Sequence, residues 1–287
     1  MIYIYRPADS DGARSLADAV HGRRWKHARP NLRRGDVVVA WGARLAPIDG
    51  VRILNGAPTS TKYEQALKLK EENVPTITVS MQAGFSAAPS ASGMAAFTNV
   101  RTAANLISAR EFGDTPLNRD LLVALRADID RALATPQPPR REWLPRTNGH
   151  IGGADLLVPT TAPDYFSLKE TIVKEFRIHS FRGKSIRAGE KKPRAGATVH
   201  PWIRSYDGGW SIDYTGFKSK QRHRELAAKA VAALGLDFGA VDIGERADKS
   251  LIVLEVNRAP GLEGGTIDHY REAILGWERE TYERRAA

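Results

Sequence analysis

The chain has 287 residues, 42% of them hydrophobic and 26% charged, a composition that excludes a disordered chain and allows about two domains. It has no cysteine, which excludes disulfides, thiolate-bound metals and cysteine nucleophiles. It also has neither a signal-peptide core nor a run of about 18 apolar residues, so we expect a cytoplasmic protein. The formal net charge of +10 favours an anionic ligand or partner.

The first 80 residues alternate strand and helix patterns, which is typical of a parallel α/β sheet. The second helix follows a threonine and serine cluster that suits an N-cap, and Pro75 ends it. The predicted strands are 1–5, 37–41, 51–55 and 76–80, and the predicted helices are 13–20 and 62–73.

In the middle of the chain, the sequence predicts a boundary between two lobes. We predict a mobile, small-residue-rich loop at 82–98, a helix at 117–134 and a proline-rich connector at 135–142. The remainder is rich in strand patterns, so the predicted fold class is α+β, a parallel N-terminal lobe followed by an antiparallel one. Its predicted strands are 142–147, 155–159, 174–181, 184–189, 239–244 and 251–257, with a hairpin of 202–206 and 210–214 about the turn 207–209 and helices at 220–234 and 266–285.

Most of the positive charge lies between Lys174 and Arg224. This segment holds 13 Lys or Arg residues and four Asp or Glu residues, so its net charge is +9. A solvated basic face, a nucleic-acid surface and a phosphate-handling active site all fit this excess.

Four aromatic residues are spaced along the same half of the chain. Interleaved aromatics and cations are typical of single-stranded nucleic-acid binding, but the period of the predicted hairpin explains them better as one apolar face. They are Trp202, Tyr206, Trp210 and Tyr214.

Oxygen-bearing side chains follow one another on two predicted neighbouring strands. Asp242 lies in GAVDIG, and Glu255 and Asn257 lie in LIVLEVN. Residues i and i+2 of a strand share a face, so Glu255 and Asn257 point the same way. Carboxylate and amide oxygens suit Mg²⁺, which proteins commonly share with substrate phosphates. Their apolar flanks argue against solvated edge residues, because buried carboxylates need a partner.

These residues carry a family resemblance. The segments GAVDIG and LIVLEVNRAPGLEG resemble the C-terminal signature of the ATP-grasp superfamily, in the form found in RimK-like ligases. The segment KEFRIHSFRGKSI resembles a strand pair of phage-encoded carboxylate–amine ligases of that type, and residues 55–80 resemble the superfamily's N-S-K helix and the strand after it. The resemblance implies an ATP-grasp fold with a pre-ATP-grasp α/β domain at 1–80. A small subdomain with the connecting helix and proline-rich linker then spans 81–170, and a large subdomain with the metal site and C-terminal helix spans 171–287.

The resemblance further implies an ATP-dependent ligase of a bacterial or phage-infected cell, with ATP and Mg²⁺ as cofactors. Two lobes would clamp the nucleotide, and the γ-phosphate would pass to a substrate carboxylate, giving an acylphosphate that an amine attacks. The carboxylate and amine partners could be amino acids, peptides or proteins, and nucleic acid is disfavoured as a partner. A basic nucleic-acid-binding protein and a degenerate ATP-grasp scaffold that binds nucleotide without chemistry are the alternative readings.

The resemblance also assigns roles to residues. Arg177 would neutralise the phosphates and the developing oxyanion, so we expect it to matter for the reaction more than for folding. His179 would share the face of Arg177 or pack in the core. Arg258 is assigned by its position instead: it directly follows the implied metal ligands, where it either pairs with the substrate carboxylate or faces solvent. Glu170 is the ribose candidate. The implied magnesium ligands are Asp242, Glu255 and Asn257, and the implied phosphate contacts are Arg146 in place of the usual lysine, the glycine-rich turn with His150, Gly152 and Gly153, and Lys192 and Arg194.

Overall fold

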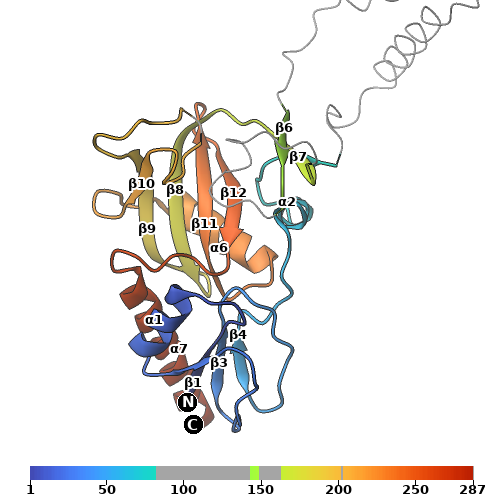
Figure 1. The fold of residues 1–287 in the computed structure, drawn as a ribbon, viewed down its shortest axis with the longest axis vertical. Coiled ribbons are helices and arrows are strands. Elements are labelled where there is room, and N and C mark those ends of the chain that lie inside the picture. Colours follow the sequence, from blue (N-terminus) through green and yellow to red (C-terminus); the bar gives the residue numbers. More distant parts are fainter. Residues whose placement is uncertain (82–142, 149–162, 202, 287) are drawn as a thin grey trace, which may run out of the picture.

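The computed structural model describes residues 1–81, 143–148, 163–201 and 203–286, which form three sheets (Figure 1). The N-terminal lobe is built on a four-stranded parallel sheet in the order β2-β1-β3-β4. Two helices complete this lobe, α1 near the start of the chain and α7 at its end. The bounds are β1 (Ile2–Tyr5), α1 (Asp11–Ala19), β2 (Arg23–Trp25), β3 (Val37–Ala40), β4 (Arg52–Leu54) and α7 (Thr266–Ala286).

Alternation along β1 explains how this lobe packs. Ile2 and Ile4 share one face and bury themselves against Leu16 of α1 and Ile274 of α7. Tyr3 points to the opposite face, where the loops between the strands cover it. The last helix of the chain therefore completes the core of the first lobe.

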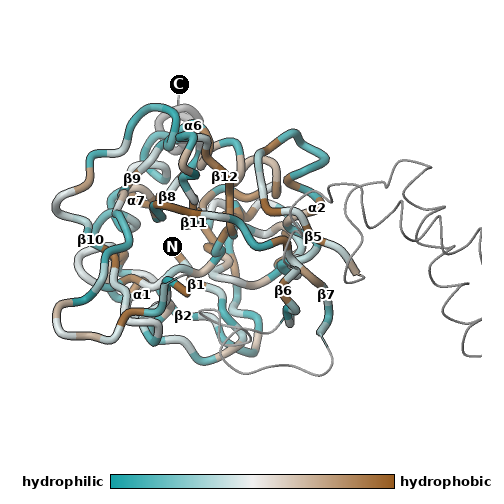
Figure 2. Tube along the Cα trace, turned by 90° about the horizontal axis from the view of Figure 1, so that it is seen from above, coloured by the Kyte–Doolittle hydropathy of each residue, from teal (hydrophilic) through white to brown (hydrophobic). Residues whose placement is uncertain are grey.

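The large lobe is a five-stranded antiparallel sheet in the order β10-β9-β8-β11-β12. Its apolar face packs against α6, with Ala227 and Val231 of the helix against Ile178 and Val241 of the sheet. Hydrophobic residues of β11 and β12 lie inside the molecule in the view from above (Figure 2). The bounds are β8 (Ile172–Phe181), β9 (Lys184–Pro193), β10 (Trp210–Asp213), α6 (Gln221–Ala233), β11 (Phe238–Arg246) and β12 (Leu251–Asn257).

A small antiparallel sheet lies beside the large one, in the order β5-β7-β6. The helix α2 begins after Thr61, whose side chain accepts from the Glu64 N–H while Glu64 reaches back, a capping box. A bridge between Thr76 and Val253 ties the segment after α2 to the large sheet. The bounds are α2 (Lys62–Glu71), β5 (Val79–Ser80), β6 (Trp143–Arg146) and β7 (Tyr165–Leu168).

The predicted combination of a parallel lobe with antiparallel sheets is confirmed. The predicted loop 82–98, helix 117–134, connector 135–142 and strand 155–159 lie outside the described residues. In the part of the chain that the structure describes, no helix has the length and apolar character needed to cross a bilayer. The boundaries between the three predicted domains stay a prediction.

The predicted hairpin is wrong. β10 pairs with β9, with Ser211 opposite Lys192, and residues 203–209 are not a strand. They form compact turns in which a Cβ on Gly208 would lie 2.1 Å from the Ile203 carbonyl oxygen, while Gly209 has a φ of +85°. These glycines thus serve a close approach and a left-handed residue, not a two-residue hairpin turn. The prediction that the four aromatic residues form one apolar face is wrong as well, because Tyr206 is exposed whereas Tyr214 contacts a buried histidine.

Candidate active site

One face of the large sheet is covered by α6, and the opposite face carries charged side chains. The strand register places Asp242 of β11 between Arg177 of β8 and Glu255 of β12. Glu175 lies two residues before Arg177 and therefore on the same face, and Lys191 of β9 reaches both Glu175 and Asp242. We call these five residues the charged face. Cross-strand pairing of β8, β9, β11 and β12 thus gathers residues that are up to 80 positions apart.

Arg177 and Asp242 form a two-pronged ion pair. Arg177 donates from Nε to Asp242 Oδ1 and from Nη2 to Oδ2, each at 2.7 Å. Lys191 Nζ lies 3.2 Å from Asp242 Oδ2 and also donates to Glu175. The side chain of Asp242 is 5% exposed and that of Arg177 is 21% exposed, so the arginine is the more accessible member of the pair.

Burial and neighbouring charges set the ionisation of these groups. Burial alone would raise the pKa of Asp242, but the charges and hydrogen bonds of Arg177 and Lys191 together hold its pKa well below the usual range. Burial, reinforced by the charge of Asp242, raises the pKa of Glu175 despite Lys191. Asp242 is therefore ionised at neutral pH.

Glu255 has different partners from Asp242. Its carboxylate lies 2.7 Å from Lys62 Nζ at the start of α2, and it accepts from Asn257 Nδ2 at 2.7 Å. Burial opposes ionisation of Glu255, but Lys62, with help from Asn257, lowers its pKa. The predicted metal ligands Asp242, Glu255 and Asn257 thus meet on adjacent strands, with both carboxylates ionised.

The donor set of these three residues fits a hard divalent cation, because two carboxylates and an amide offer only oxygen atoms. The described residues include no group of three or more His, Cys, Asp or Glu side chains that could hold a metal ion. A cation bound here would therefore need further oxygen ligands from water or from a phosphate.

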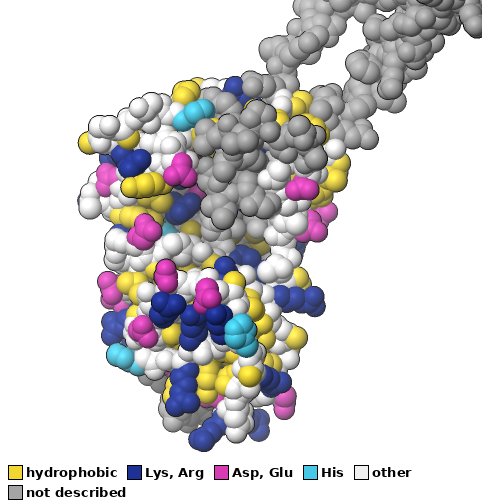
Figure 3. All heavy atoms as spheres, in the orientation of Figure 1, with side chains coloured by type: hydrophobic (Ala, Val, Ile, Leu, Met, Phe, Trp, Pro, Cys, Tyr) yellow, Lys and Arg dark blue, Asp and Glu magenta, His cyan; other side chains and the backbone are white. Residues whose placement is uncertain are grey.

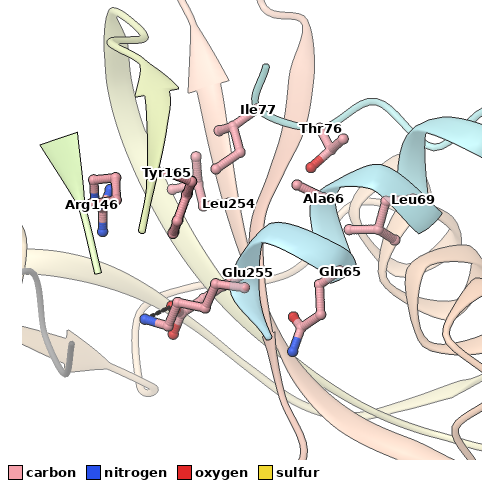
Figure 4. A pocket seen from close by; sticks show the side chains of 10 residues that line it. Gln65, Ala66, Leu69, Thr76, Ile77, Arg146, Tyr165, Leu254 and Glu255 are labelled. Carbon is pink, nitrogen blue, oxygen red and sulfur yellow. Dashed lines mark ion pairs between the residues drawn. The ribbon is translucent and has the colours of Figure 1, made fainter. Parts of the chain in front are cut away.

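A pocket adjoins the charged face beside Glu255, between α2, β6, β7 and β12 (Figure 4). One part of its lining is apolar and comes from Ala66, Leu69, Ile77, Tyr165 and Leu254. The other part is polar and comes from Lys62, Gln65, Thr76, Arg146 and Glu255. In Figure 4, Arg146 and Tyr165 lie on the strands of the small sheet, with Tyr165 beside Leu254, and the side chains of α2 lie on the other side of the view. The pocket thus combines a wall suited to a flat apolar group with cations near an ionised carboxylate.

A buried histidine links the charged face to α7. His179 is fully buried, and its two ring nitrogens lie 3.3 Å from the Tyr270 hydroxyl and 3.0 Å from the Tyr214 hydroxyl. Burial lowers the pKa of His179 to about 3, so the ring is neutral at physiological pH. Tyr214 is only partly buried and lies under the guanidinium of Arg187, 3.8 Å from the ring centroid. His179 is therefore a core residue that positions a tyrosine on the side of the sheet that bears Arg177.

Arg258 does not present its charge to solvent. It is 8% exposed, and it donates to the backbone carbonyls of residues 43, 55, 57 and 58. Asn55, a neighbour in this network, bonds in turn to Asp237 and Phe238 at the start of β11. These contacts favour a positioning role, in which Arg258 fixes the loop after β12 against the N-terminal lobe, over direct pairing with a substrate carboxylate.

Three other predicted contacts lie away from the charged face. Lys192 is on the opposite side of β9 from Lys191 and pairs with Asp213 at 2.7 Å. Arg194 follows the end of β9 and stacks on the exposed ring of Tyr206 at 3.8 Å. Glu170 pairs with Arg246 at 3.0 Å and is not among the pocket residues. The predicted glycine-rich turn with His150, Gly152 and Gly153 lies outside the described residues.

Three charged residues of the site were not predicted, namely Lys62, Glu175 and Lys191. Lys191 sits in a run of two lysines, and only the register of β8 with β9 tells which of them points to Asp242. Lys62 begins α2, and the capping pattern at Thr61 located that helix start without showing what the lysine would contact. Both contacts join residues that are far apart in sequence.

No protein-family model matches the chain. Among curated proteins, the probable alpha-L-glutamate ligase of Parasynechococcus marenigrum is 33% identical over 122 residues, which is 39% of this chain and 25% of that protein. The ribosomal protein bS6--L-glutamate ligase of Escherichia fergusonii is 50% identical over 44 residues, which is 15% of this chain and 14% of that protein. The matches thus span a quarter or less of these relatives.

Solved structures match over nearly the whole chain. The ATP-grasp ligase PsnB complexed with a phosphomimetic variant of its minimal precursor, Mg and ADP gives a TM-score of 0.53 at 12% identity, covering 96% of this chain and 97% of that one. PsnB with precursor peptide PsnA2 and AMPPNP gives 0.51 at 11% identity, covering 97% and 98%. At such identities the likeness concerns the fold alone. The chain has an ATP-grasp fold, and its resemblance to RimK-like ligases is confirmed.

Proposed function

We propose that this protein is an ATP-dependent carboxylate–amine ligase that forms an amide bond and releases ADP. The observation that carries the proposal is the charged face, where Arg177 and Lys191 lie against ionised Asp242 beside Glu255 and the pocket. Cations next to ionised carboxylates suit phosphate groups that bind together with a divalent cation. The ligase names of the curated relatives support the same class of reaction.

The pocket is the proposed site of the nucleotide base and ribose. Leu254, Tyr165 and Ile77 supply apolar surface for the base. Arg146 and Lys62, which pairs with Glu255, supply positive charge. An arginine serves here because it is always charged and can bind phosphate oxygens with two donors. The phosphates would then extend from the pocket toward Arg177 and Lys191. Mg²⁺ held by Asp242, Glu255 and Asn257 would neutralise phosphate charge.

The proposed reaction has two steps. A carboxylate oxygen of the first substrate attacks the γ-phosphorus of ATP, the bond to the β-phosphate oxygen breaks, and ADP leaves. The amine of the second substrate then attacks the acyl carbon, phosphate leaves, and the amine gives up a proton. Arg177 and Lys191 stabilise negative charge on the transferred phosphoryl group, because fixed cations in a partly dry site act strongly on developing charge.

The proposed substrates are peptides or proteins. Two solved ATP-grasp neighbours are complexes of PsnB with its minimal precursor or precursor peptide, and one curated relative is named for a ribosomal protein. The retained set of Arg177, Asp242, Glu255 and Asn257 argues against a scaffold that binds nucleotide without chemistry.

The deciding experiment measures nucleotide products while acceptor proteins and amino acids are screened, with intact mass recorded for each protein. An active pair should release ADP and phosphate and add the mass of the amine less one water. With hydroxylamine in place of the amine, a hydroxamate should form on the carboxylate partner only when ATP is present. Release of AMP and pyrophosphate would refute the acylphosphate route.

A further inference from the structure

A second basic region lies outside the charged face, on the N-terminal lobe. Between Asp18 and Asp36 the sequence holds six Lys or Arg residues and no acidic residue. These six residues, which we call the basic edge, are Arg23, Arg24, Lys26, Arg29, Arg33 and Arg34. We propose that the basic edge docks an acidic segment of the polypeptide substrate and leads it toward the active site. This inference rests on the proposed ligase function.

The cations of the basic edge face solvent. Arg23, Arg29, Arg33 and Arg34 are exposed, and Arg24 and Lys26 are partly exposed. Asp9 is shared by Arg24 at 3.3 Å and Lys26 at 2.7 Å. Figure 3 shows Lys and Arg side chains, with Asp and Glu side chains beside them, on the lower part of the molecule, which Figure 1 identifies as the N-terminal lobe. The six cations of the basic edge thus outnumber the one carboxylate that forms ion pairs with them in the described structure.

The backbone of the basic edge offers a place for an extended chain. β2 is an edge strand, which in the described structure pairs only with β1. The Arg6 N–H donates to the Trp25 carbonyl at 3.1 Å, so that carbonyl points toward β1. The alternation of a strand then directs the N–H and C=O of Arg24 away from the sheet. Such outward groups are what an added peptide strand pairs with.

The basic edge is connected to the active site through two short segments. Arg24 donates to the Ala8 carbonyl at 3.3 Å, which places the loop after β1 beside the edge. Just beyond that loop, a Cβ on Gly12 would lie 3.9 Å from Leu262 Cδ1. Leu262 belongs to the loop that follows Asn257. A chain docked on β2 thus lies on the lobe whose helix α1 adjoins the loop that follows the metal-ligand strand.

An acidic polypeptide explains this surface better than a nucleic acid does. Single-stranded nucleic acids bind where aromatic rings are offered for base stacking between cations. The aromatic residue within the basic edge, Trp25, is 6% exposed and packs against Tyr5 with ring centroids 4.5 Å apart. The edge therefore offers cations and backbone groups but keeps its ring in the core. Carboxylates of an extended acidic chain match both features.

The test is direct binding of a fluorescein-labelled ten-residue glutamate peptide, followed by anisotropy at 150 mM salt without ATP. The variant R29E/R33E reverses two exposed cations of the edge. The matched control K68E/K70E reverses two exposed lysines of α2 and changes the net charge equally. We expect R29E/R33E to weaken binding about tenfold or more and K68E/K70E to change it less than twofold, because short-range contacts exceed the screened effect of net charge.

Equal weakening by both variants, or no binding of the glutamate peptide by the wild-type protein, would overturn the proposal. So would a single-stranded oligonucleotide of equal charge that binds more tightly and displaces the peptide. Binding of Mg-ATP is measured on the same variants. If the wild-type protein binds the peptide as expected but not Mg-ATP, the proposed function fails while the docking surface stands, so the two failures are distinguishable.

Discussion

Replacing Arg177 with methionine tests the central ion pair of the charged face. The change keeps an unbranched side chain but removes the two donors that hold Asp242, which is 5% exposed. Lys191 would remain as its partner at 3.2 Å. The structure therefore predicts a loss of stability as well as of turnover, which corrects the expectation from sequence that Arg177 matters little for folding.

The size of the loss follows from burial. Removing one partner of a buried pair costs about 3–5 kcal/mol, because the other charge is left without compensation. The retained lysine and the partial exposure of Arg177 bring our expectation to about 3 kcal/mol. At about 2–4 °C per kcal/mol for chains near this length, the melting temperature should fall by about 6–12 °C. In R177M/D242N, the second change removes the stranded charge, so the double variant should lose less than the sum of the single variants.

The pH dependence gives a second readout of the same pair. The pKa of Asp242 is lower in the folded state than in the unfolded state, so the pair stabilises the protein above about pH 4 and loses that effect as the pH falls further. The difference in unfolding free energy between wild type and R177M should therefore shrink below about pH 4. Denaturant unfolding across the pH range measures it. A stability change below about 0.5 kcal/mol at pH 7, or a double variant as unstable as the sum, would refute the reasoning.

Three further predictions follow from the site. K191M should lower turnover about 100-fold or more while K192M stays within about twofold, because only the first lysine contacts Asp242; steady-state ADP release compares these neighbours. The unfolding free energy of the wild type should fall by about 2 kcal/mol between pH 6.5 and pH 5, and this fall should be smaller in H179Q. The reason is that the unfolded chain takes up a proton near pH 6.5, whereas folded His179, with its pKa lowered to about 3, does not; an equal fall in the variant would assign it to other groups. E255Q/N257A should abolish the magnesium dependence of ATP-analogue binding in calorimetry, and unchanged affinity and stoichiometry would exclude these metal ligands.

Sequence patterns predicted the elements well where the information is local. The apolar run that opens residues 251–257, and the cap and proline that bound α2, located these elements closely. The hairpin failed because alternation reports that a segment is extended but not which strand it pairs with. Residues 210–213 alternate equally well beside β9 as they would beside residues 202–206.

The same limit applies to the site. Asp242, Glu255 and Asn257 could be predicted together because each lies at a definite position on an apolar strand. The choice between Lys191 and Lys192 needs the register of β9 against β8, and a slip of one residue would exchange their faces. The burial of Arg258 depends on carbonyls about 200 residues earlier in the chain, which no local pattern reports.

The charges of the site also bear on how its ligands bind. Arg177 and Lys191 now neutralise Asp242, and Lys62 neutralises Glu255. An anionic ligand on this face would compete with the two carboxylates for those cations. A cation that turns to the anionic ligand would leave its ionised, buried carboxylate without a positive partner, which costs free energy. Polyphosphate and a divalent cation should therefore bind with positive cooperativity, each raising the affinity for the other by the same factor, because linkage is reciprocal.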